Sequence, residues 1–363
     1  MALELASRHR LVPPPNPSVG CVITSAQGVV LGRGCTQRAG GPHAEIVALR
    51  DAAARGNSVE GGTAYVTLEP CSHHGRTGPC CDALIKAGIK KVVASIADPN
   101  PLVSGQGFAR LRAAGIEVEV GPGAEESRAL NIGFFSRMIR KRPWVRMKIA
   151  ASLDGKTALD NGKSQWITSD AARADGHAWR ARSCAVLTGI GTVLDDNPRL
   201  DVRLIDALRQ PHLVVVDGRL ETPLDANLFV PGRSLFIYAA VQDDARRKAL
   251  EARGATVIYL PGQTDGAQGK VDLAAMLRDL ATREVNELHV EAGHRLNGSL
   301  IRESLVDELV VYLAPKLIGR GRDMAGFGPL ADLAAAVPLA FTSTTMLGPD
   351  LRVTAQIAGR DRF

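Results

Sequence analysis

The chain has 363 residues, which is enough for about two domains of ordinary size. It is 45% hydrophobic and 23% charged with a mean hydropathy near zero, which excludes a disordered chain, a collagen-like repeat and a coiled coil. The formal net charge of +6 is modest and is not gathered into a basic run, so it suits an anionic substrate at least as well as a polynucleotide.

The sequence carries no evident targeting segment. No stretch approaches the roughly 18 continuous apolar residues of a membrane helix, and the N-terminal segment lacks the apolar core of a secretory signal. Six cysteines are too sparse for a disulfide framework. Three of them lie between residues 71 and 81 beside two histidines, which indicates metal binding or catalysis in a reducing compartment. We therefore expect a cytoplasmic protein.

Short β-branched runs alternate with helical stretches in both halves, which is typical of an α/β fold. The strands predicted in the first half are Val19–Ile23, Ala64–Leu68, Lys91–Ile96 and Ile116–Val120. The helices predicted there are His43–Arg55, Cys80–Ala87, Phe108–Ala114 and Glu125–Ile139. A charged triplet followed by Pro143 interrupts the pattern, which predicts domains of residues 1–142 and 143–363.

The second half predicts a doubly wound, largely parallel sheet. Its expected strands are Trp144–Ala151, Ala185–Thr188, His212–Val216, Ser234–Tyr238, Thr256–Leu260, Glu287–Val290 and Glu308–Leu313. Its expected helices include Ala171–Arg182, Asp243–Arg253, Leu273–Ala281 and Arg295–Glu303. Near the end, Phe341–Leu347 and Leu351–Ile357 flank a Gly-Pro-Asp turn, which predicts an antiparallel hairpin on the sheet edge.

His43, Cys71 and Cys80 form a zinc-binding pattern in the first half. One imidazole and two thiolates are good ligands for Zn²⁺, and they leave open the fourth tetrahedral position that a catalytic site requires. Zinc lowers the pKa of a bound water towards neutrality. Glu45, near the start of the same predicted helix as His43, would carry protons at a site beyond the helix N-terminus. The order H-x-E, then P-C and C, is typical of zinc nucleobase deaminases.

Alternatives remain open for the ligand set. Cys71 and Cys80 are nine positions apart, whereas the usual motif is C-x-x-C, although a polar loop can bring its ends together at small entropic cost. Cys81 would point about 100° away from Cys80 on a helix, so it is the weaker candidate. His73 or His74 is a further candidate. A purely structural zinc site would add Cys81 or His74 and leave the acidic residue of the motif without a role.

Three places in the second half are of interest for a cofactor. Gly189-Ile190-Gly191-Thr192 follows a predicted strand, but Leu194 replaces the third glycine of a dinucleotide fingerprint, so alone it favours an ordinary strand-to-helix turn. Gly293 lies between a strand and a helix, where doubly wound folds hold phosphates. Glu291 beside it is either a buried ion-pair residue or a ligand contact. Lys148 lies inside a strand, where a charge is unusual unless it is paired or faces a cleft.

With these residues assembled, the chain resembles the bifunctional deaminase and reductase family of bacterial riboflavin biosynthesis over nearly its whole length. The first half carries the resemblance in residues 15–22 (PNPSVGCV), 43–45 (HAE) and 67–81 (TLEPCSHHGRTGPCC). The second half carries it in residues 151–155 (ASLDG), 164–168 (SQWIT), 306–309 (VDEL) and 314–316 (APK). So many matches in one order are more specific than any single motif.

The resemblance implies a cytidine-deaminase-like three-layer domain followed by a dihydrofolate-reductase-like doubly wound domain. It implies zinc-dependent hydrolytic deamination of 2,5-diamino-6-ribosylamino-4(3H)-pyrimidinone 5′-phosphate, and then NADPH-dependent reduction of the ribosyl side chain to ribityl. By the same resemblance His43, Cys71 and Cys80 hold one zinc ion and Glu45 is the catalytic proton carrier. The family has the same long spacing between its two cysteines.

The resemblance also assigns residues in the reductase half. Lys148 is implied to be catalytic and to face the ribose. The implied substrate contacts are Ser164, Arg180, Leu200, Arg203 and Glu291. The implied NADPH contacts are Ala150, Trp166, Thr192, Asp196, Gly293, His294, Arg295, Leu296, Asn297, Gly298 and Ser299. The chain departs from the family at Gly218, where relatives often carry a hydroxyl residue, and at its start, which falls within what resembles the first helix of the family.

We expect a small phosphorylated pyrimidine and further copies of the chain as partners, and neither nucleic acid nor a membrane. The main rival is a nucleic-acid-editing zinc deaminase with a fused nucleotide-binding domain, given the pI near 9.1. That enzyme needs basic and aromatic residues around its site, whereas aromatic residues make up only 4% of the chain and form no stacking cluster. The non-enzymatic alternative is a zinc-stabilised binding module.

Overall fold

The computed structural model describes residues 1–12, 14–73, 78–101, 103–262 and 269–363. The chain divides into two compact units, Met1–Arg140 and Lys141–Phe363, which we call the N-terminal and C-terminal units. The division falls two residues before the boundary expected from the sequence. Within the described ranges, no helix has the length and apolar character needed to cross a membrane.

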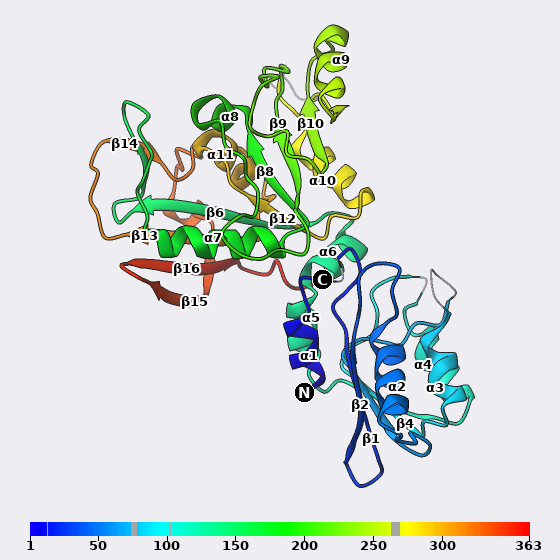
Figure 1. Cartoon of the computed structure of the whole chain (residues 1–363). Coiled ribbons are helices and arrows are strands. Elements are labelled where there is room, and N and C mark those ends of the chain that lie inside the picture. The colour runs from blue at the N-terminus through cyan, green and yellow to red at the C-terminus, as the bar shows by residue number, and fades with distance from the viewer. Residues whose placement is uncertain (13, 74–77, 102, 263–268) are drawn as a thin grey trace. The chain divides into compact units, whose positions relative to one another are not determined.

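A five-stranded sheet in the order β2-β1-β3-β4-β5 forms the centre of the N-terminal unit (Figure 1). Its strands are β1 Gly20–Thr24, β2 Val30–Cys35, β3 Thr63–Val66, β4 Lys91–Ala94 and β5 Glu117–Val120. One face carries α2 Ala44–Ala54, α3 Cys80–Lys86 and α4 Gln106–Ala113, and the other carries α1 Ala2–Arg8 and α5 Ala124–Leu130, with α6 Ile132–Arg140 following. These layers confirm the predicted three-layer α/β domain.

The direction of the strands brings three segments of the N-terminal unit to one edge of its sheet. β1 is antiparallel to both β2 and β3, and β3 is parallel to β4, so β2, β3 and β4 all run the same way. The segments that follow these three strands contain His43, Cys71 and Asp98, respectively. Ligand sites of α/β sheets lie at the carboxyl ends of parallel strands, so the topology places the predicted zinc motif where such a site is expected.

The sequence pattern does not predict β2, because Gly32 and Gly34 interrupt its apolar residues. The structure shows why glycine is needed there. A β-carbon at position 32 would lie 2.3 Å from the carbonyl oxygen of Ala48, and one at position 34 would lie 2.2 Å from that of Ala44. The two glycines therefore let α2, which begins beside the zinc motif, pack directly on the backbone of β2.

The prediction of one helix over Glu125–Ile139 is wrong. α5 ends at Leu130 and α6 begins at Ile132, with Asn131 between them. The Asn131 side chain accepts a hydrogen bond from the N–H of Ser18 at 2.7 Å and donates one to its carbonyl oxygen at 3.0 Å. These bonds hold Asn131 to the segment before β1 at the point where its backbone angles, φ −113° and ψ 21°, depart from those of a helix.

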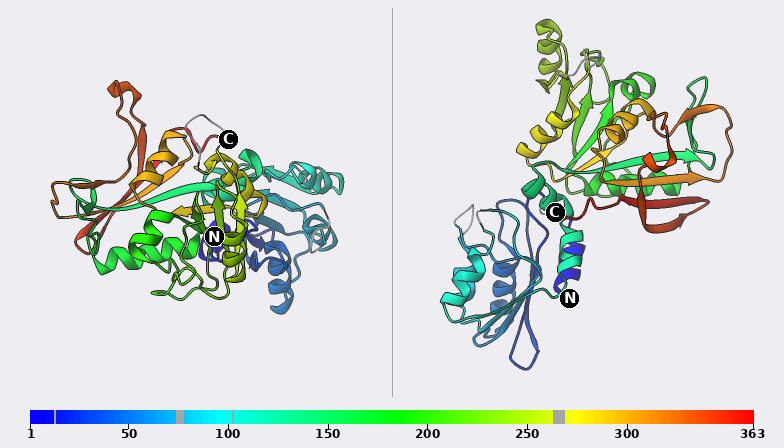
Figure 2. Two further views of the ribbon diagram at one scale, coloured as in Figure 1. Left: turned by 90° about the horizontal axis from the view of Figure 1, so that it is seen from above. Right: turned by 180° about the vertical axis from the view of Figure 1, so that it is seen from behind.

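A nine-stranded sheet in the order β11-β10-β9-β8-β12-β6-β13-β16-β15 forms the C-terminal unit. Its strands are β6 Trp144–Ser152, β8 Ala185–Gly189, β9 His212–Val216, β10 Leu235–Ala239, β11 Ala255–Tyr259, β12 Glu287–Val290, β13 Glu308–Ala314, β15 Leu339–Leu347 and β16 Asp350–Ile357. All neighbouring pairs are parallel except those that involve β16. The predicted doubly wound sheet and its edge hairpin β15–β16 are confirmed (Figure 2).

Helices cover both faces of this sheet. The helices are α7 Asp170–Arg182, α8 Ile190–Asp196, α9 Asp244–Ala252, α10 Leu273–Thr282 and α11 His294–Arg302. α10 and α11 bury Met276, Leu277 and Leu300 in the core on one face, and α8 and α9 bury Val193 and Leu250 in the core on the other. A separate pair of short strands, β7 Lys156–Leu159 and β14 Gly321–Asp323, was not expected from the sequence.

β6 has one apolar and one polar face. Val145, Met147 and Ile149 point into the core beneath α10 and α11. The intervening residues Arg146 and Lys148 point to the opposite face, because successive side chains of a strand alternate between faces. This alternation puts two cations inside the unit, on the face that α7 covers (Figure 1).

Arg146 is fully buried, and two carboxylates compensate its charge. Its guanidinium lies 2.7 Å from Glu287 on β12 and 2.9 Å from Glu308 on β13, the two strands that flank β6. It also stacks over the ring of Trp179 on α7, at 4.7 Å from the ring centroid. The buried charges therefore connect three strands and a helix next to Lys148.

Candidate functional site

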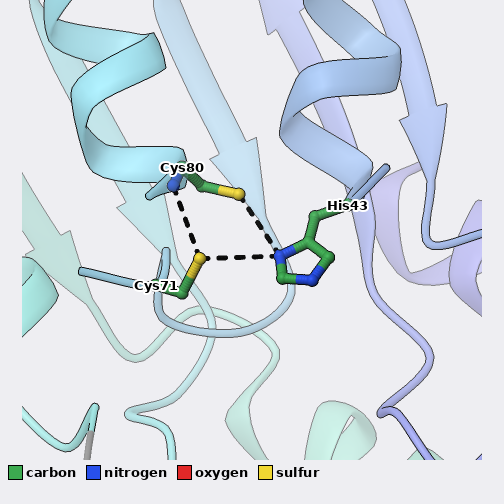
Figure 3. A group of neighbouring side chains, drawn as sticks. All are labelled: His43, Cys71 and Cys80. Atoms are coloured by element: carbon green, nitrogen blue, oxygen red, sulfur yellow. Dashed lines mark hydrogen bonds between the residues drawn. The ribbon is translucent and has the colours of Figure 1, made fainter. Parts of the chain in front are cut away.

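The ligand atoms of His43, Cys71 and Cys80 gather at the carboxyl edge of the N-terminal sheet. Among the residues that the structure describes, these three atoms form the one His, Cys, Asp or Glu cluster compatible with a metal ion, within 4.8 Å of one another. Nδ1 of His43 lies 3.5 Å from Sγ of Cys71 and 3.4 Å from Sγ of Cys80 (Figure 3). Tetrahedral zinc with ordinary Zn–N and Zn–S bonds separates such atoms by about 3.6 Å, so the donor set fits zinc.

Local backbone structure aims these side chains at one point. His43 is the N-cap of α2, with extended backbone angles, and Cys80 is the first residue of α3, after Pro79. The N–H of Cys80 lies 3.4 Å from Sγ of Cys71. The Cys80 thiol and the His43 ring lower the pKa of Cys71 to about 4, against the effect of burial. Helix N-termini likewise favour a thiolate over a thiol.

Glu45 lies in the first turn of α2 and is 4% exposed. Burial, and then the negative charge of Cys71, raise the pKa of the Glu45 carboxyl to about 7. A carboxyl group with a pKa near neutrality can both accept and release a proton under physiological conditions. This arrangement fits a proton carrier beside a metal.

The alternative ligands take up other positions or lie outside the described residues. Cys81 is buried, and its thiol faces the carbonyl oxygens of Pro70 and Gly107 at 3.1 and 3.5 Å rather than joining the cluster. His73 is not part of the cluster. His74 lies outside the described residues. Cys81 therefore does not complete the four-ligand structural site that the sequence leaves open.

A second polar cluster lies on the α7 face of the C-terminal sheet. Glu291, just after β12, pairs with Arg180 of α7 through both carboxylate oxygens, one at 2.9 Å from Nη2 and the other in contact with Nε. Nζ of Lys148 lies 3.8 Å from the same carboxylate. Burial raises the pKa of the Glu291 carboxyl, but the positive charge of Arg180 and its hydrogen bonds outweigh burial and hold this pKa far below its usual range. Burial lowers the pKa of Lys148, and Glu291 opposes that effect.

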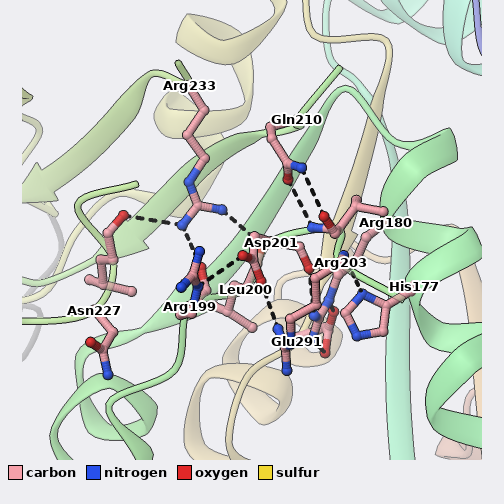
Figure 4. Close-up of polar contacts among 12 residues, drawn as sticks. His177, Arg180, Arg199, Leu200, Asp201, Arg203, Gln210, Asn227, Arg233 and Glu291 are labelled. Atoms are coloured by element: carbon pink, nitrogen blue, oxygen red, sulfur yellow. Dashed lines mark hydrogen bonds and ion pairs between the residues drawn. The ribbon is translucent and has the colours of Figure 1, made fainter. Parts of the chain in front are cut away.

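The segment 199–203 brings the other predicted substrate residues to this cluster (Figure 4). Nη1 of Arg180 donates to the carbonyl oxygen of Asp201 at 3.0 Å, and the Asp201 carboxylate lies 2.6 Å from Nη1 of Arg203. Leu200, the residue before Asp201, is 5% exposed and adopts a left-handed backbone with φ +50°. The structure thus brings Arg180, Leu200, Arg203 and Glu291 together, while Ser164 lies in the segment between β7 and α7.

Sequence reasoning missed the residues that organise this segment. Asp201 holds both Arg203 and Arg199, the latter at 2.9 Å. His177 accepts a hydrogen bond from the N–H of Arg203 at 3.3 Å, and Arg233 donates to the carbonyl oxygen of Leu200 at 2.9 Å. The charge at every second position in Arg199-Leu200-Asp201-Val202-Arg203 is the one sequence signal for this arrangement.

The expected NADPH residues cluster mainly at two helix starts. β8 and β12 are parallel neighbours, so α8 and α11 begin at the same sheet edge. A β-carbon at Gly293, the N-cap of α11, would lie 3.8 Å from Oγ1 of Thr192 on α8. Such adjoining N-termini suit phosphate groups, so these residues fit a dinucleotide. Asp196 is the last residue of α8, and His294 and Arg295 form the start of α11.

The remaining expected NADPH residues have diverse surroundings. Ala150 faces Tyr312 across β6 and β13, and Trp166 is 63% exposed with the Arg173 guanidinium over its ring. Leu296 packs against the backbone of Gly189, and the Ser299 hydroxyl donates to the carbonyl oxygen of Arg295. Asn297 and Gly298 pack on residues 324–326. The Asn297 amide donates to Met324, and a β-carbon at 298 would lie 2.1 Å from the Gly326 oxygen.

Gly218 has a structural reason to be glycine. A β-carbon at this position would lie 2.3 Å from the carbonyl oxygen of Gly269, so the present backbone has no room for a hydroxyl side chain. A hydroxyl residue at this position would therefore require movement of the backbone at Gly269.

His289 lies between the two ion clusters of the C-terminal unit and is fully buried. Its register partner on β6 is Arg146, and its Nε2 lies 3.6 Å from Glu291. Within the part of the chain that the structure describes, neither ring nitrogen has a hydrogen-bond partner. Burial lowers the pKa of His289 to about 3, so the ring is neutral at physiological pH.

Comparison with known proteins gives matches over both units. Residues 1–96 match the cytidine and deoxycytidylate deaminase zinc-binding region, and residues 143–353 match the RibD C-terminal domain. The riboflavin biosynthesis protein RibD of Escherichia coli is 45% identical over 96% of each chain, and that of Aquifex aeolicus is 39% identical over 97% of this chain and 95% of its own.

Solved structures agree over the whole length. Acinetobacter baumannii RibD superposes with a TM-score of 0.87 at 39% identity, covering 98% of this chain and 96% of its own. A Thermotoga maritima diaminohydroxyphosphoribosylaminopyrimidine deaminase/5-amino-6-(5-phosphoribosylamino)uracil reductase superposes with a TM-score of 0.84 at 32% identity, covering 98% and 97%. The rival hypothesis of a nucleic-acid-editing deaminase does not account for the match over residues 143–353.

The neutral state of His289 predicts a pH dependence of stability. Its folded pKa of about 3 is below the unfolded value of 6.5, so unfolding takes up a proton between these values and stability falls as the pH falls. Each such proton contributes a slope of about 1.4 kcal/mol per pH unit. We expect His289→Leu to reduce the slope between pH 6 and pH 4 by about this amount.

Urea unfolding followed by tryptophan fluorescence measures this slope for the C-terminal unit alone, because that unit contains all three tryptophans, Trp144, Trp166 and Trp179. Equal slopes for the wild type and His289→Leu would contradict the prediction.

Proposed function

Because the chain belongs to the RibD family, the bifunctional deaminases and reductases of riboflavin biosynthesis, we propose which residues carry its two reactions and on which substrate they act. As a member of that family it is a zinc-dependent deaminase and an NADPH-dependent reductase. We assign deamination to the N-terminal unit and reduction to the C-terminal unit. The cluster of His43, Cys71 and Cys80 beside the buried Glu45 carries this proposal.

The proposed deaminase substrate is 2,5-diamino-6-ribosylamino-4(3H)-pyrimidinone 5′-phosphate, whose 2-amino group is replaced by oxygen. When bound by His43, Cys71 and Cys80, zinc supplies a water of lowered pKa as the nucleophile. Glu45 would take one proton from that water and pass it to the ring nitrogen, and then carry the second proton of the same water to the amine, which leaves as ammonia while the oxygen stays on the ring carbon. Its burial and its pKa near 7 support this role.

In the reductase reaction the ribosyl side chain becomes ribityl. NADPH supplies the hydride when it is bound, and the starts of α8 and α11, with Thr192 and Gly293, would hold its phosphates. We assign Lys148 to the ribose. Its side chain keeps 24% of its surface exposed while it pairs with Glu291.

Arg203 is the stronger candidate of the two predicted substrate arginines for the phosphate. The Arg180 side chain is 14% exposed and is engaged by Glu291 and by the Asp201 carbonyl oxygen. The Arg203 side chain is 50% exposed and is held from one side by the Asp201 carboxylate. A guanidinium with an open face binds phosphate through paired hydrogen bonds, whereas Arg180 is suited to orienting Glu291.

We further propose that a second copy of the chain covers the edge strand β15. An open edge strand offers unpaired backbone groups, and this one also exposes Leu339, Phe341 and Met346 at 46%, 76% and 62%. A reducing compartment, the cytoplasm, is proposed because Cys71 and Cys80 must stay reduced to bind zinc as thiolates, and all six cysteines are free.

Substitutions in the N-terminal unit test the zinc site. We expect Cys80→Ser to lose zinc and deamination, because the site then keeps only two ligands. Cys81→Ser is the control and is expected to retain zinc, because the Cys81 thiol faces carbonyl oxygens.

Substitution of Glu45 tests the proton carrier. We expect Glu45→Gln to retain zinc and to oxidise NADPH with deaminated substrate at the wild-type rate, and its deamination rate to fall at least 100-fold. Zinc per chain by mass spectrometry, ammonia release and NADPH absorbance measure these results. Wild-type ammonia release by Glu45→Gln would refute the assignment.

Substitution of Arg203 tests the phosphate contact. We expect Arg203→Ala to raise the reductase KM about 10- to 100-fold, because it removes paired hydrogen bonds to a charged group. The KM for the dephosphorylated substrate is expected to stay the same. Arg320→Ala serves as the control, because the Arg320 side chain is 96% exposed. An equal rise in KM for both substrates would argue against a phosphate contact.

The oligomer proposal is tested by sedimentation. We expect the wild-type chain to sediment as a dimer or a larger assembly, and Phe341→Glu to shift it towards the monomer, because a charge on the contact face opposes association. Val29→Glu is the matched control, since Val29 is 62% exposed in the other unit. A wild-type monomer at micromolar concentration contradicts the proposal.

A further inference from the structure

Glu69 is a buried carboxylate that accepts four hydrogen bonds from one stretch of backbone among the described residues. It lies between β3 and the Cys71 ligand and is 4% exposed. Its Oε2 accepts the N–H groups of Asp98 at 3.1 Å and Gly105 at 2.9 Å. Its Oε1 accepts those of Gly107 at 2.9 Å and Phe108 at 3.2 Å. One side chain therefore ties down both ends of the segment 98–108.

This segment lies beside the proposed zinc ligands. It follows β4, the parallel neighbour of β3, so both chain segments leave the sheet at the same edge. A β-carbon at Gly107 would lie 2.1 Å from the carbonyl oxygen of Pro70, so the segment packs directly on the residue before Cys71. The buried carboxyl of Asp98 is close enough to His43 and Cys71 for their charges to interact.

The contacts require a carboxylate at position 69. Two oxygens with no attached hydrogen can accept four N–H bonds, and bonds from N–H to a charged acceptor are about twice as strong as neutral ones. A glutamine has the same shape but only one such oxygen. Its NH₂ group would face two N–H donors and leave them buried without an acceptor.

We infer that Glu69 is a positioning residue of the deaminase, which fixes the described residues 98–101 and 103–108 as one wall of the site beside the zinc ligands and thereby sets the affinity for the pyrimidine substrate. The inference rests on the zinc site and substrate proposed above. The Glu69 carboxylate bonds backbone N–H groups of this wall. It acts through the backbone that carries Asp98.

Glu69→Gln in the full-length, zinc-loaded enzyme tests this role. We expect one zinc per chain and an unchanged rate of NADPH oxidation with deaminated substrate. We expect the deaminase KM to rise at least tenfold, with a smaller change in kcat. Glu60→Gln, an exposed glutamate of the same unit, is the control and should leave KM unchanged. An unchanged KM in Glu69→Gln overturns the inference.

A second variant disturbs the same contact from the other side. Gly107→Ala leaves Glu69 intact but places a β-carbon against Pro70, so we expect the same rise in KM with zinc retained. If Glu69→Gln loses zinc, the deaminase KM of Gly107→Ala becomes the deciding measurement. An unchanged KM in Gly107→Ala then overturns the inference. Failure of the wild type to bind zinc or to release ammonia would instead refute the proposed function, so the two failures are distinguishable.

Discussion

Three charged groups in the interior, Glu69, Arg146 and Glu291, depend on partners because an unpaired charge removed from water is destabilising by several kcal/mol. Four backbone N–H groups surround Glu69, two carboxylates face Arg146, and Arg180 grips Glu291. Each set of partners comes from elements far apart in the sequence. Compensation of buried charge therefore fixes where the loops around both sites can lie, and it does so more strictly than apolar packing, which tolerates substitution of similar volume.

The order of elements and the doubly wound sheet follow from local patterns in the sequence, and the ends of the predicted elements differ from the structure by at most two residues in the C-terminal unit. The exceptions have long-range causes. Glycine has a low strand propensity, so Gly32 and Gly34 argue against a strand in the sequence. In the structure their lack of a side chain allows α2 to pack on β2. Asn131 reads as an ordinary helical residue, yet its side chain bonds the backbone of Ser18 instead. Neither contact leaves a periodic signal in the residues around it.

The predicted site residues divide in the same way. The residues of the proposed zinc site belong to short motifs in which residue type and order indicate the chemistry, so the sequence alone is sufficient to propose them. They are His43, Glu45, Cys71 and Cys80. Glu69 and His177 accept hydrogen bonds from backbone N–H groups, which nearly every residue possesses, whereas Asp201 holds the side chains of Arg199 and Arg203. No residue type at positions 105–108 indicates a partner for Glu69, so only the folded chain identifies this anchor. Sequence motifs therefore identify the residues that contact a ligand more readily than the residues that hold those ligand contacts in position.

The proposed reactions place a further constraint on the C-terminal unit. Deamination replaces an amine on the ring with oxygen and leaves the ribosyl phosphate unchanged, so a phosphate contact through Arg203 is the same before and after it. That contact increases the affinity of the reductase for both forms equally, so it cannot make the reductase select the deaminated form. The two forms differ at two ring positions, because the amine donor becomes an oxygen acceptor and the ring nitrogen beside it gains a proton. A reductase group that donates to the oxygen would be left without an acceptor by the amine, at a cost of about 1–3 kcal/mol, or roughly 5- to 150-fold in affinity. A group that makes reduction follow deamination must therefore contact the ring at one of these two positions, and it is separate from the arginines proposed for the phosphate.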